Sequence, residues 1–341
     1  MSKHHIIVAS LFALTLGACN LDNIKDSKVQ RLTTERDVKG LIDNYIKKTP
    51  TFGTDQAAEA LGNLGDKQAV EPLMTLLKTP IKSSASSAEI KASAAAALAL
   101  GKLQDTRAVK SLVANVKHPN RTIANAAKTG LKEIATANPQ VINQLLVDFK
   151  KDDANAVAAL GAIGKPALKA MLIALKEPDA RIRTNAASVL YDIGDPTAIE
   201  PLTKNLTDLA SSPMVALALE KLNWQPQSTA DKVYFLIAKR KGEELRHNWE
   251  MTKNVLLKDL ASNQPRKIDY ALYSFIGIGG KDTTETLVKV LKEQGHKNLA
   301  LTYINSGEPT LEKAAYDWAK SRGYTVIKTT QKDQSVKWGS F

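Results

Sequence analysis

Residue types that carry catalysis or bind metals are few and scattered in this chain. Cys19 is the only cysteine among 341 residues, so no disulfide can form within the chain. Beyond the N-terminal segment the histidines are His118, His247 and His296, which stand singly. None has the His-x-x-x-His spacing that places two ligands on one helix face. We expect no metal site and no cofactor.

Two pairs of adjacent carboxylates could suggest acid–base chemistry. They are Asp152-Asp153 and Glu243-Glu244. Neighbours in sequence do not face each other on a helix. We interpret both pairs as solvated charge, and the sequence offers no catalytic acid–base pair.

A glycine-rich stretch from Gly277 to Asp282 resembles a phosphate-binding loop only faintly. The phosphate-loop pattern needs a glycine where Phe275 stands, and a Ser or Thr where Asp282 stands. We interpret the stretch as the end of one helix and the start of another, and the sequence predicts no nucleotide site.

Aromatic and basic residues gather after residue 223 and could form a recognition patch. Trp, Tyr and Arg are favoured anchors of protein interfaces. The alternative is that the rings fill a hydrophobic core. The candidate partner-binding residues are Trp224, Tyr234, Lys239, Arg240, Arg246 and Trp249.

The N-terminus reads as an export signal. Lys3 precedes an apolar run from Ile6 to Leu16, too short to span a bilayer. The stretch Leu16-Gly17-Ala18-Cys19 resembles the lipobox of bacterial lipoproteins. This resemblance implies a signal peptide over residues 1–18 and acylation of Cys19 by palmitate-type chains, which together anchor a protein firmly to membrane lipid.

The residues after Cys19 indicate where such an anchor would hold the protein. In lipoproteins of this type an Asp at the second position retains the protein in the inner membrane, and this chain has Asn20. The resemblance therefore implies the outer membrane, facing the periplasm. Residues 19–36 are polar and without periodicity, and we expect a flexible tether there. A capping helix should follow over residues 37–53.

From Thr54 onward the chain repeats itself. Residues 60–66, Ala-Leu-Gly-Asn-Leu-Gly-Asp, return as Ala-Leu-Gly-Lys-Leu-Gln-Asp at residues 99–105. The leading leucines of six copies are Leu61, Leu100, Leu131, Leu160, Leu190 and Leu219. A period near 30 residues indicates stacked repeats. The longer first interval has room for a loop insertion between Ile81 and Ser87.

Each copy has the same anatomy. A first helix rich in small residues is followed by a Gly or Gly-Asp turn, which ends one helix and caps the next. A second, amphipathic helix follows. Pro72 and Pro201 lie near the start of this second helix, where a missing N–H is tolerated.

These residues look like the HEAT repeat of the phycobilin-lyase-like type, over residues 54–222 in about six units. The resemblance implies an all-α fold, an α-solenoid that winds as a right-handed superhelix. Related scaffolds include deoxyhypusine hydroxylase, which binds two irons through His-Glu dipeptides, and phycobilin lyases, which attach tetrapyrroles. This chain has no His-Glu dipeptide, and nothing beyond the repeat supports a lyase.

The composition changes near residue 223: all four tryptophans of the chain lie beyond it. We expect residues 223–341 to form an aromatic-rich helical C-terminal cap. The tail from Tyr324 to Lys328 alternates loosely and predicts one short strand or extended segment.

The formal net charge of +12 permits an anionic partner. The first hypothesis is a membrane-tethered, non-catalytic scaffold that binds a protein partner in the cell envelope through its second helices. The second is a factor that binds cell wall or another anionic polymer through a basic surface. The third is an enzyme, by scaffold analogy alone. Nucleic acid is not expected as a partner of an exported lipoprotein.

Overall fold

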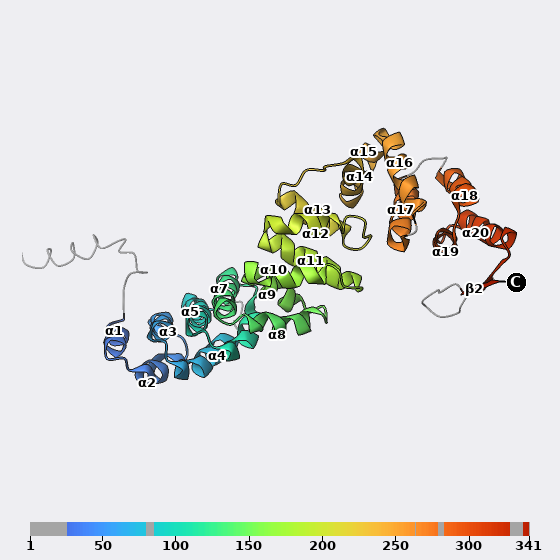
Figure 1. Cartoon of the computed structure of the whole chain (residues 1–341). Coiled ribbons are helices and arrows are strands. Elements are labelled where there is room, and N and C mark those ends of the chain that lie inside the picture. The colour runs from blue at the N-terminus through green and yellow to red at the C-terminus, as the bar shows by residue number, and fades with distance from the viewer. Residues whose placement is uncertain (1–25, 80–84, 263, 279–282, 328–336, 341) are drawn as a thin grey trace, which may run out of the picture. The chain divides into compact units, whose positions relative to one another are not determined.

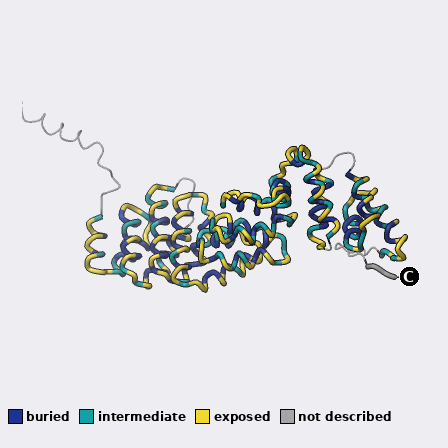
Figure 2. The backbone as a smooth tube through the Cα atoms, turned by 45° about the horizontal axis from the view of Figure 1, so that its top comes forward, coloured by how far each residue is buried: buried dark blue, intermediate teal, exposed yellow. Residues whose placement is uncertain are grey.

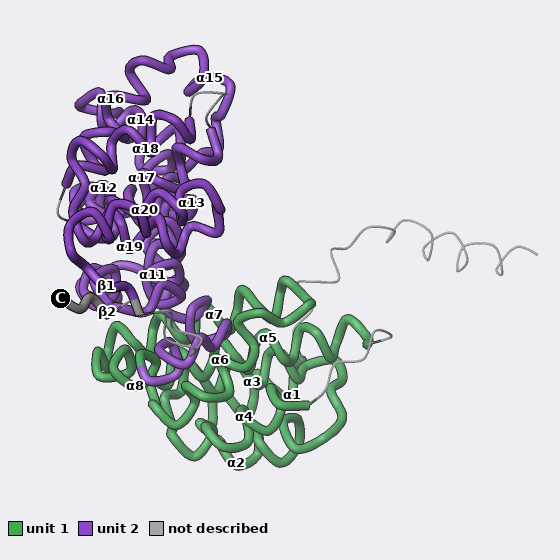
Figure 3. The backbone as a smooth tube through the Cα atoms, turned by 90° about the vertical axis from the view of Figure 1, so that its right-hand side faces the viewer, with its two compact units in different colours: residues 1–146 green, residues 147–341 purple. Residues whose placement is uncertain are grey.

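The computed structural model describes residues 26–79, 85–262, 264–278, 283–327 and 337–340 (Figure 1). The signal peptide, Cys19 and the residues from Gly279 to Asp282 lie outside these ranges, so the predictions made for them stay predictions. The chain divides into two compact units, residues 1–146 and 147–341 (Figure 3).

Almost every element in the described ranges is helical. Those of residues 26–146 are α1 (Ser27–Thr34), α2 (Val38–Leu41) with a π-helical turn (Ile42–Ile46), α3 (Thr54–Leu64), α4 (Val70–Lys78), α5 (Ser87–Leu103), α6 (Val109–Asn115), α7 (Arg121–Ala137) and most of α8 (Gln140–Phe149). A 3-10 turn precedes α4 and α6, at Lys67–Ala69 and Thr106–Ala108.

The second unit continues this pattern. Its helices are α9 (Ala154–Ile163), α10 (Leu168–Ala174), α11 (Ala180–Ile193), α12 (Ile199–Thr203), α13 (Ser212–Lys221), α14 (Thr229–Ala238), α15 (Gly242–His247), α16 (Trp249–Leu260), α17 (Pro265–Ile278), α18 (Thr283–Gln294), α19 (Lys297–Ile304) and α20 (Pro309–Ser321). The prediction of an all-α repeat fold is confirmed.

Helix α1 lies where the sequence predicted a flexible tether. The side chain of Asp26 accepts hydrogen bonds from the backbone N–H groups of Lys28 and Val29, which caps the helix. Val29 and Leu32, three residues apart, lie on one face and are buried. Helix α1 also packs against α2 and α3, so tertiary contacts support a helix in a segment whose composition is polar.

The first helices of the repeats pack through residues with little or no side chain. Helix α5 lies between α3 and α7. A Cβ atom on Gly101 would lie 2.5 Å from the Cα of Gly130, and one on Gly130 would lie 2.4 Å from the carbonyl oxygen of Ala97. The backbones therefore approach as closely as glycine permits, as the small-residue pattern predicted.

The turns between first and second helices also follow the prediction. Gly65 and Gly194 end α3 and α11 in the left-handed conformation, at φ +77° and +67°. The side chains of Asp66 and Asp195 then accept the backbone N–H two residues on and cap the 3-10 turn. The expectation of a Gly-Asp turn is confirmed at these positions.

A buried ion pair fixes the segment between α12 and α13. Arg183 Nη2 lies 2.6 Å from Asp208 Oδ2, and both side chains are less than a tenth exposed. Arg183 also donates to the carbonyl oxygens of Glu177 and Pro178. Asp208 accepts from both the N–H and the hydroxyl of Ser211.

The two-layer pairing of helices extends past residue 222. Helix α17 packs on α19, while α14 packs on α16 and α18 on α20. We call α14, α16, α18 and α20 the second-layer helices, because they continue the alternation begun by the second helices of the repeats. In Figure 2 buried residues run between the layers and exposed residues face outward. The predicted cap is thus built in the same manner as the array.

The chain closes on a short antiparallel pair of strands, β1 (Tyr324–Ile327) and β2 (Lys337–Ser340), with Tyr324 opposite Ser340. The sequence predicted one short strand or extended segment here, and the structure adds the second strand. Within the described ranges, no single helix has both the length and the apolar composition to cross a membrane.

Candidate functional site

The aromatic residues of the predicted recognition patch fill the interior of the second unit. Trp224 is 9% exposed, and its ring meets that of Phe235 edge-on at 5.5 Å. Trp249 contacts Phe275 in the same way at 5.4 Å. These contacts pack Trp224 on α14 and α16 on α17, and Trp249 remains partly exposed.

Tyr234 belongs to a buried polar network. Its hydroxyl donates to Asp259 Oδ2 at 2.6 Å, and the hydroxyl of Tyr270 donates to the carbonyl oxygen of Tyr234. Burial raises the pKa of Asp259, against the lowering effects of the Tyr234 hydrogen bond and of Lys267. Burial, with the neighbouring Asp259, likewise raises the pKa of Tyr234. The network pins α14 to α16 and α17.

The three candidate cations lie at the end of α14 and on α15. Lys239 pairs with Glu220 and lies 5.8 Å from the ring centre of Phe235. Arg240 takes a left-handed backbone conformation just after α14, and Arg246 lies on α15; both are exposed. The packing of Trp224 and Trp249 agrees with the alternative of a hydrophobic core, and a joint recognition patch of the six residues stays a hypothesis.

The histidines have local structural roles or are exposed. His118 Nδ1 accepts the backbone N–H of Asn120 at 3.0 Å, and His296 Nδ1 accepts that of Leu299 and caps α19. His247 is exposed on α15. No group of three metal-ligating side chains occurs among the described residues.

The adjacent carboxylates behave as caps or exposed charges. Asp153 accepts the N–H groups of Asn155 and Ala156 at the start of α9, and Asp152 accepts the side-chain amide of Asn185. Glu243 and Glu244 are exposed in the first turn of α15.

One hollow lies between the second-layer helices α14 and α16. It has a volume of about 640 Å³. Phe235, Leu236 and Met251 supply its apolar wall, and the segment from Gln225 to Thr229 forms its rim together with Lys232. The hollow borders the predicted patch but is lined by none of the six predicted residues.

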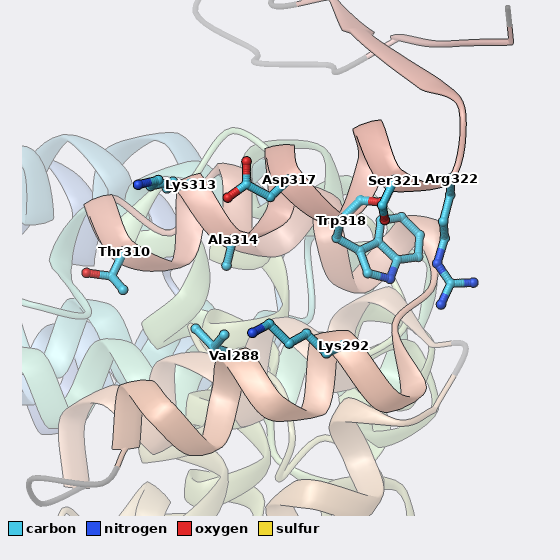
Figure 4. A pocket seen from close by; sticks show the side chains of 9 residues that line it. All are labelled: Val288, Lys292, Thr310, Lys313, Ala314, Asp317, Trp318, Ser321 and Arg322. Atoms are coloured by element: carbon cyan, nitrogen blue, oxygen red, sulfur yellow. The ribbon is translucent and has the colours of Figure 1, made fainter.

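A longer groove runs between the second-layer helices α18 and α20. It consists of two adjoining hollows of about 460 and 440 Å³ that share Val288, Lys292 and Thr310 (Figure 4). Thr284 and Thr310 line one end, while Lys292 and Trp318 line the other. The residue numbers of the lining side chains increase in the same direction along both helices. The groove therefore runs from the N-terminal turns of α18 and α20 to their C-terminal turns.

The floor of this groove is apolar. Val288 and Ala314 form the middle and are themselves packed on the hydrophobic core. The hollow that Thr284 lines also has Glu285, Glu293, Lys289 and Lys292 in its wall, and Lys289 lies 3.8 Å from Glu293.

The hollow that Trp318 lines has charged residues along its whole length. They are Lys292, Lys313, Arg322 and Asp317. All four residues are exposed, and no salt bridge involves any of them within the part of the chain that the structure describes. Lys313 lies beside Thr310 and Arg322 lies at the opposite end, beyond Trp318 (Figure 4), so the cations do not form one cluster.

An aromatic stack closes the same end. The rings of Trp318 and Tyr324 are stacked at 6.0 Å, and the guanidinium of Arg322 lies 4.9 Å from the Trp318 ring centre. The ammonium of Lys297 lies 4.3 Å from the ring centre of Tyr324. These contacts, worth about 0.5–1 kcal/mol each at exposed sites, hold the end of α20 against β1.

The sequence contained the elements of this groove but not their alignment. Both helices belong to residues 223–341, which were expected to form a helical cap. Ala314 leaves room between neighbouring helices, but Ala315 and Ala319 are equally small, so residue type alone does not single it out. Only the structure shows that Ala314 faces Val288.

Comparison with protein families identifies the repeats. The model for HEAT repeats matches residues 138–223, and the model for the PBS lyase HEAT-like repeat matches residues 55–79 and 94–118. The predicted resemblance to HEAT repeats of the phycobilin-lyase-like type is therefore confirmed for these residues.

Solved structures that match this chain include the complex of CpcE and CpcF of the phycocyanin lyase from Nostoc sp. PCC7120, at 22% identity. That match covers 64% of this chain and 92% of the other, with a TM-score of 0.29. Human deoxyhypusine hydroxylase is 14% identical over 73% and 88% of the two chains, with a TM-score of 0.28. An engineered protein is 19% identical over 86% and 84%, with a TM-score of 0.27. No curated protein matches the sequence.

Proposed function

We propose that this protein is a membrane-tethered HEAT-repeat scaffold that binds a protein partner in the cell envelope and catalyses no reaction of its own. The observation that supports this most directly is the pair of hollows between second-layer helices, α14 with α16 and α18 with α20. Grooves between successive helices of a repeat array are suited to polypeptide segments.

The membrane tether rests on the lipobox-like residues Leu16 to Cys19. Helix α1 is capped by Asp26, so only six residues separate Cys19 from the folded body. Even fully extended, the seven peptide units from Cys19 to Asp26 reach about 25 Å. An acylated Cys19 would therefore hold the first helices close to the membrane surface.

A non-catalytic role is supported by the chemistry of the sites. The hollows are lined by aliphatic, aromatic, hydroxyl and amide side chains together with lysines, Arg322 and three carboxylates, and their lining residues include no histidine or cysteine. The sequence lacks the His-Glu dipeptides that hold iron in deoxyhypusine hydroxylase.

Crosslinking in intact cells, followed by purification through a tag and mass spectrometry, tests this proposal. We expect one or a few envelope proteins to be recovered reproducibly. An unrelated lipoprotein that carries the same first 26 residues serves as the matched control for proximity at the membrane. Recovery of the same proteins with the control, or of none with the scaffold, would reject the proposed function.

A specific observation also favours the second candidate, a factor that binds an anionic polymer. Residues 106–132 contain no Asp or Glu, and their cations are Arg107, Lys110, Lys117, Arg121, Lys128 and Lys132. Retention on peptidoglycan or on anionic vesicles at rising salt measures this function. Electrostatic binding should weaken steeply between low and physiological salt, and retention that ignores salt would contradict it.

A further inference from the structure

We infer that the loop from Lys47 to Gly53 lies against the lipid headgroups of the membrane, with the ring of Phe52 in the interface and its lysines on anionic lipid. This inference rests on the membrane tether of the proposed function, because an acylated Cys19 is what brings the loop to the lipid. It adds the surface through which the folded body meets that membrane.

The chain enters its folded body beside this loop. The backbone N–H of Asp26, the first residue that the structure describes, donates to Gln56 Oε1 at 2.8 Å in the first turn of α3. A Cβ atom on Gly53 would lie only 2.7 Å from Asp26 Oδ2. The hydroxyl of Tyr45 donates to the same carboxylate. The loop therefore adjoins the point from which the chain leads back to Cys19.

The reach of the tether limits how far the loop can lie from the membrane. The seven peptide units from Cys19 to Asp26 span at most about 25 Å. Phe52 is joined directly to Gly53, which contacts Asp26. Because an acylated Cys19 sits at the membrane surface, Phe52 can reach the interface without any change in the fold.

Phe52 is an apolar residue that the fold leaves in water. It is 56% exposed, compared with 37% for Tyr191 and 42% for Tyr273. The ring of Tyr191 is covered by the ammonium of Lys221, 4.3 Å from the ring centre. No ring or cation–π contact involves Phe52 within the described ranges. Exposed aromatic rings of this kind insert at the boundary between headgroups and acyl chains.

Exposed cations gather in the same part of the chain. Lys47 and Lys48 lie in the loop itself, and Lys28 of α1 donates to the side chain of Asn44 in the adjoining π-helical turn at 2.8 Å. The other exposed cations between residues 26 and 53 are Arg31, Arg36 and Lys39. Each lysine or arginine close to an anionic lipid surface favours binding by about fivefold.

The nearby carboxylates are largely used by the fold. Asp26 and Asp37 accept backbone N–H groups and cap α1 and α2, and Asp43 pairs with Lys47 at 2.8 Å. Residues 44–54 contain no Asp or Glu. The loop is therefore cationic around its exposed ring, a composition that suits an anionic lipid surface.

Quenching of a fluorescent label by lipid tests the inference. Cys19 is the only cysteine, and its thiol is blocked in the acylated protein, so a new cysteine can be labelled alone. The acylated protein with Thr51→Cys is labelled and reconstituted into vesicles of phosphatidylethanolamine and phosphatidylglycerol. Lipids with a nitroxide near the headgroup should quench this label about twofold or more above the same label at Thr122→Cys on α7. Equal quenching at the two positions would overturn the inference.

The position of the control label follows from the packing of the first unit. Helix α5 lies between α3 and α7, and Thr122 is exposed on α7. Since packed helices lie about 8–10 Å apart, this label is well removed from the loop before α3.

Two variants of the labelled Thr51→Cys protein show which chemistry holds the loop. Phe52→Ser and Lys48→Glu should each lower the quenching about twofold or more, because one removes the ring and the other reverses a charge. Lys132→Glu is the matched control, since Lys132 is an exposed lysine of α7. An equal loss with Lys132→Glu would show that net charge alone draws the protein to lipid, and would overturn the inference. Circular dichroism of both variants should match the wild type, because Phe52 and Lys48 are exposed.

Mass spectrometry of the purified protein separates this inference from the function on which it rests. If Cys19 carries no acyl chain, the tether of the proposed function fails and the inference fails with it. If the protein is acylated but the label at position 51 shows no excess quenching, the inference fails while the tether stands. A label that is shielded both from nitroxide lipid and from iodide in the water would show that protein covers the loop, which also overturns the inference.

Discussion

The close packing of α5 on α7 makes a strong prediction about Gly130. In the substitution Gly130→Ala the new Cβ atom would lie 2.4 Å from the carbonyl oxygen of Ala97, while the next nearest atoms are 3.4 Å away. Carbon and carbonyl oxygen rarely approach within 3.0 Å, so one helix must move by more than half an ångström. Neither partner can yield by rotating a side chain, because the contact is with backbone.

The magnitude follows from two opposing effects. Overpacking of a tight contact costs about 1–3 kcal/mol, and this contact involves backbone, which favours the upper part of the range. Alanine gains about 1 kcal/mol over glycine in helix propensity. We expect a net destabilisation of about 1–2 kcal/mol, which corresponds to a fall of roughly 4–10 °C in the midpoint of thermal unfolding for a unit of this size.

Circular dichroism during thermal and urea unfolding measures the change, and hydrogen exchange of peptides from α5 and α7 localises it. Gly277→Ala is the matched control: Gly277 is an exposed residue of α17, and a Cβ there meets nothing within 4 Å. That variant should be slightly more stable than the wild type. If Gly130→Ala is equally stabilising, the packing argument for the first helices is refuted.

Three further predictions follow from single residues. Arg183→Ala should destabilise by about 3–5 kcal/mol, because it leaves Asp208 buried without its ion-pair partner. Burial alone would raise the pKa of Asp208, but the hydrogen bonds from Ser211 and the charge of Arg183 outweigh burial and lower this pKa. The ionised carboxylate therefore stabilises the fold above its unfolded pKa. The loss of urea stability in Arg183→Ala should shrink as the pH falls through the lowered pKa of Asp208. Asp259→Asn should have the opposite pH dependence. Burial raises the pKa of Asp259, so the protonated carboxyl stabilises the fold below its unfolded pKa, and this contribution disappears as the pH rises through the folded pKa. An Asp259→Asn variant that is less stable than wild type at pH 8 but not at pH 4 would contradict this. Cys19→Ala should move the protein from the membrane to the soluble fraction in cell fractionation, and unchanged membrane association would refute the lipobox interpretation.

The repeat array was predictable because its determinants are local. A leucine every 30 residues or so, alanines and glycines on one helix face, and Gly-Asp turns each act within a few residues. The loop insertion after Ile81 also agrees with the start of α5 at Ser87. Such signals need no knowledge of which helix packs against which.

The binding surface was harder to predict, because it depends on alignment between helices. The sequence drew attention to Trp224, Tyr234 and Trp249 through their residue type, and the structure uses these rings for packing. Conversely, Val288 and Ala314 are unremarkable by type, and they form a groove only because α18 and α20 lie side by side. Composition cannot separate a buried aromatic residue from an exposed one.

The N-terminal boundary shows a third kind of difference. Residues 19–36 are polar overall, which predicted a tether, but Val29 and Leu32 share one face and Tyr45 donates a hydrogen bond to Asp26. This hydrogen bond joins residues that are 19 positions apart in the sequence. The local pattern of apolar residues within α1 therefore gives no sign of it.

A photo-crosslinking scan in living cells tests most directly whether the second-layer helices bind the partner. Benzoylphenylalanine would replace the exposed residues Lys289 and Lys313 in the groove, and Thr122 and Thr129 on the first helix α7. We expect crosslinks to the same envelope protein from positions 289 and 313 and none from positions 122 and 129. Crosslinks from α7 alone would contradict binding through the second-layer helices.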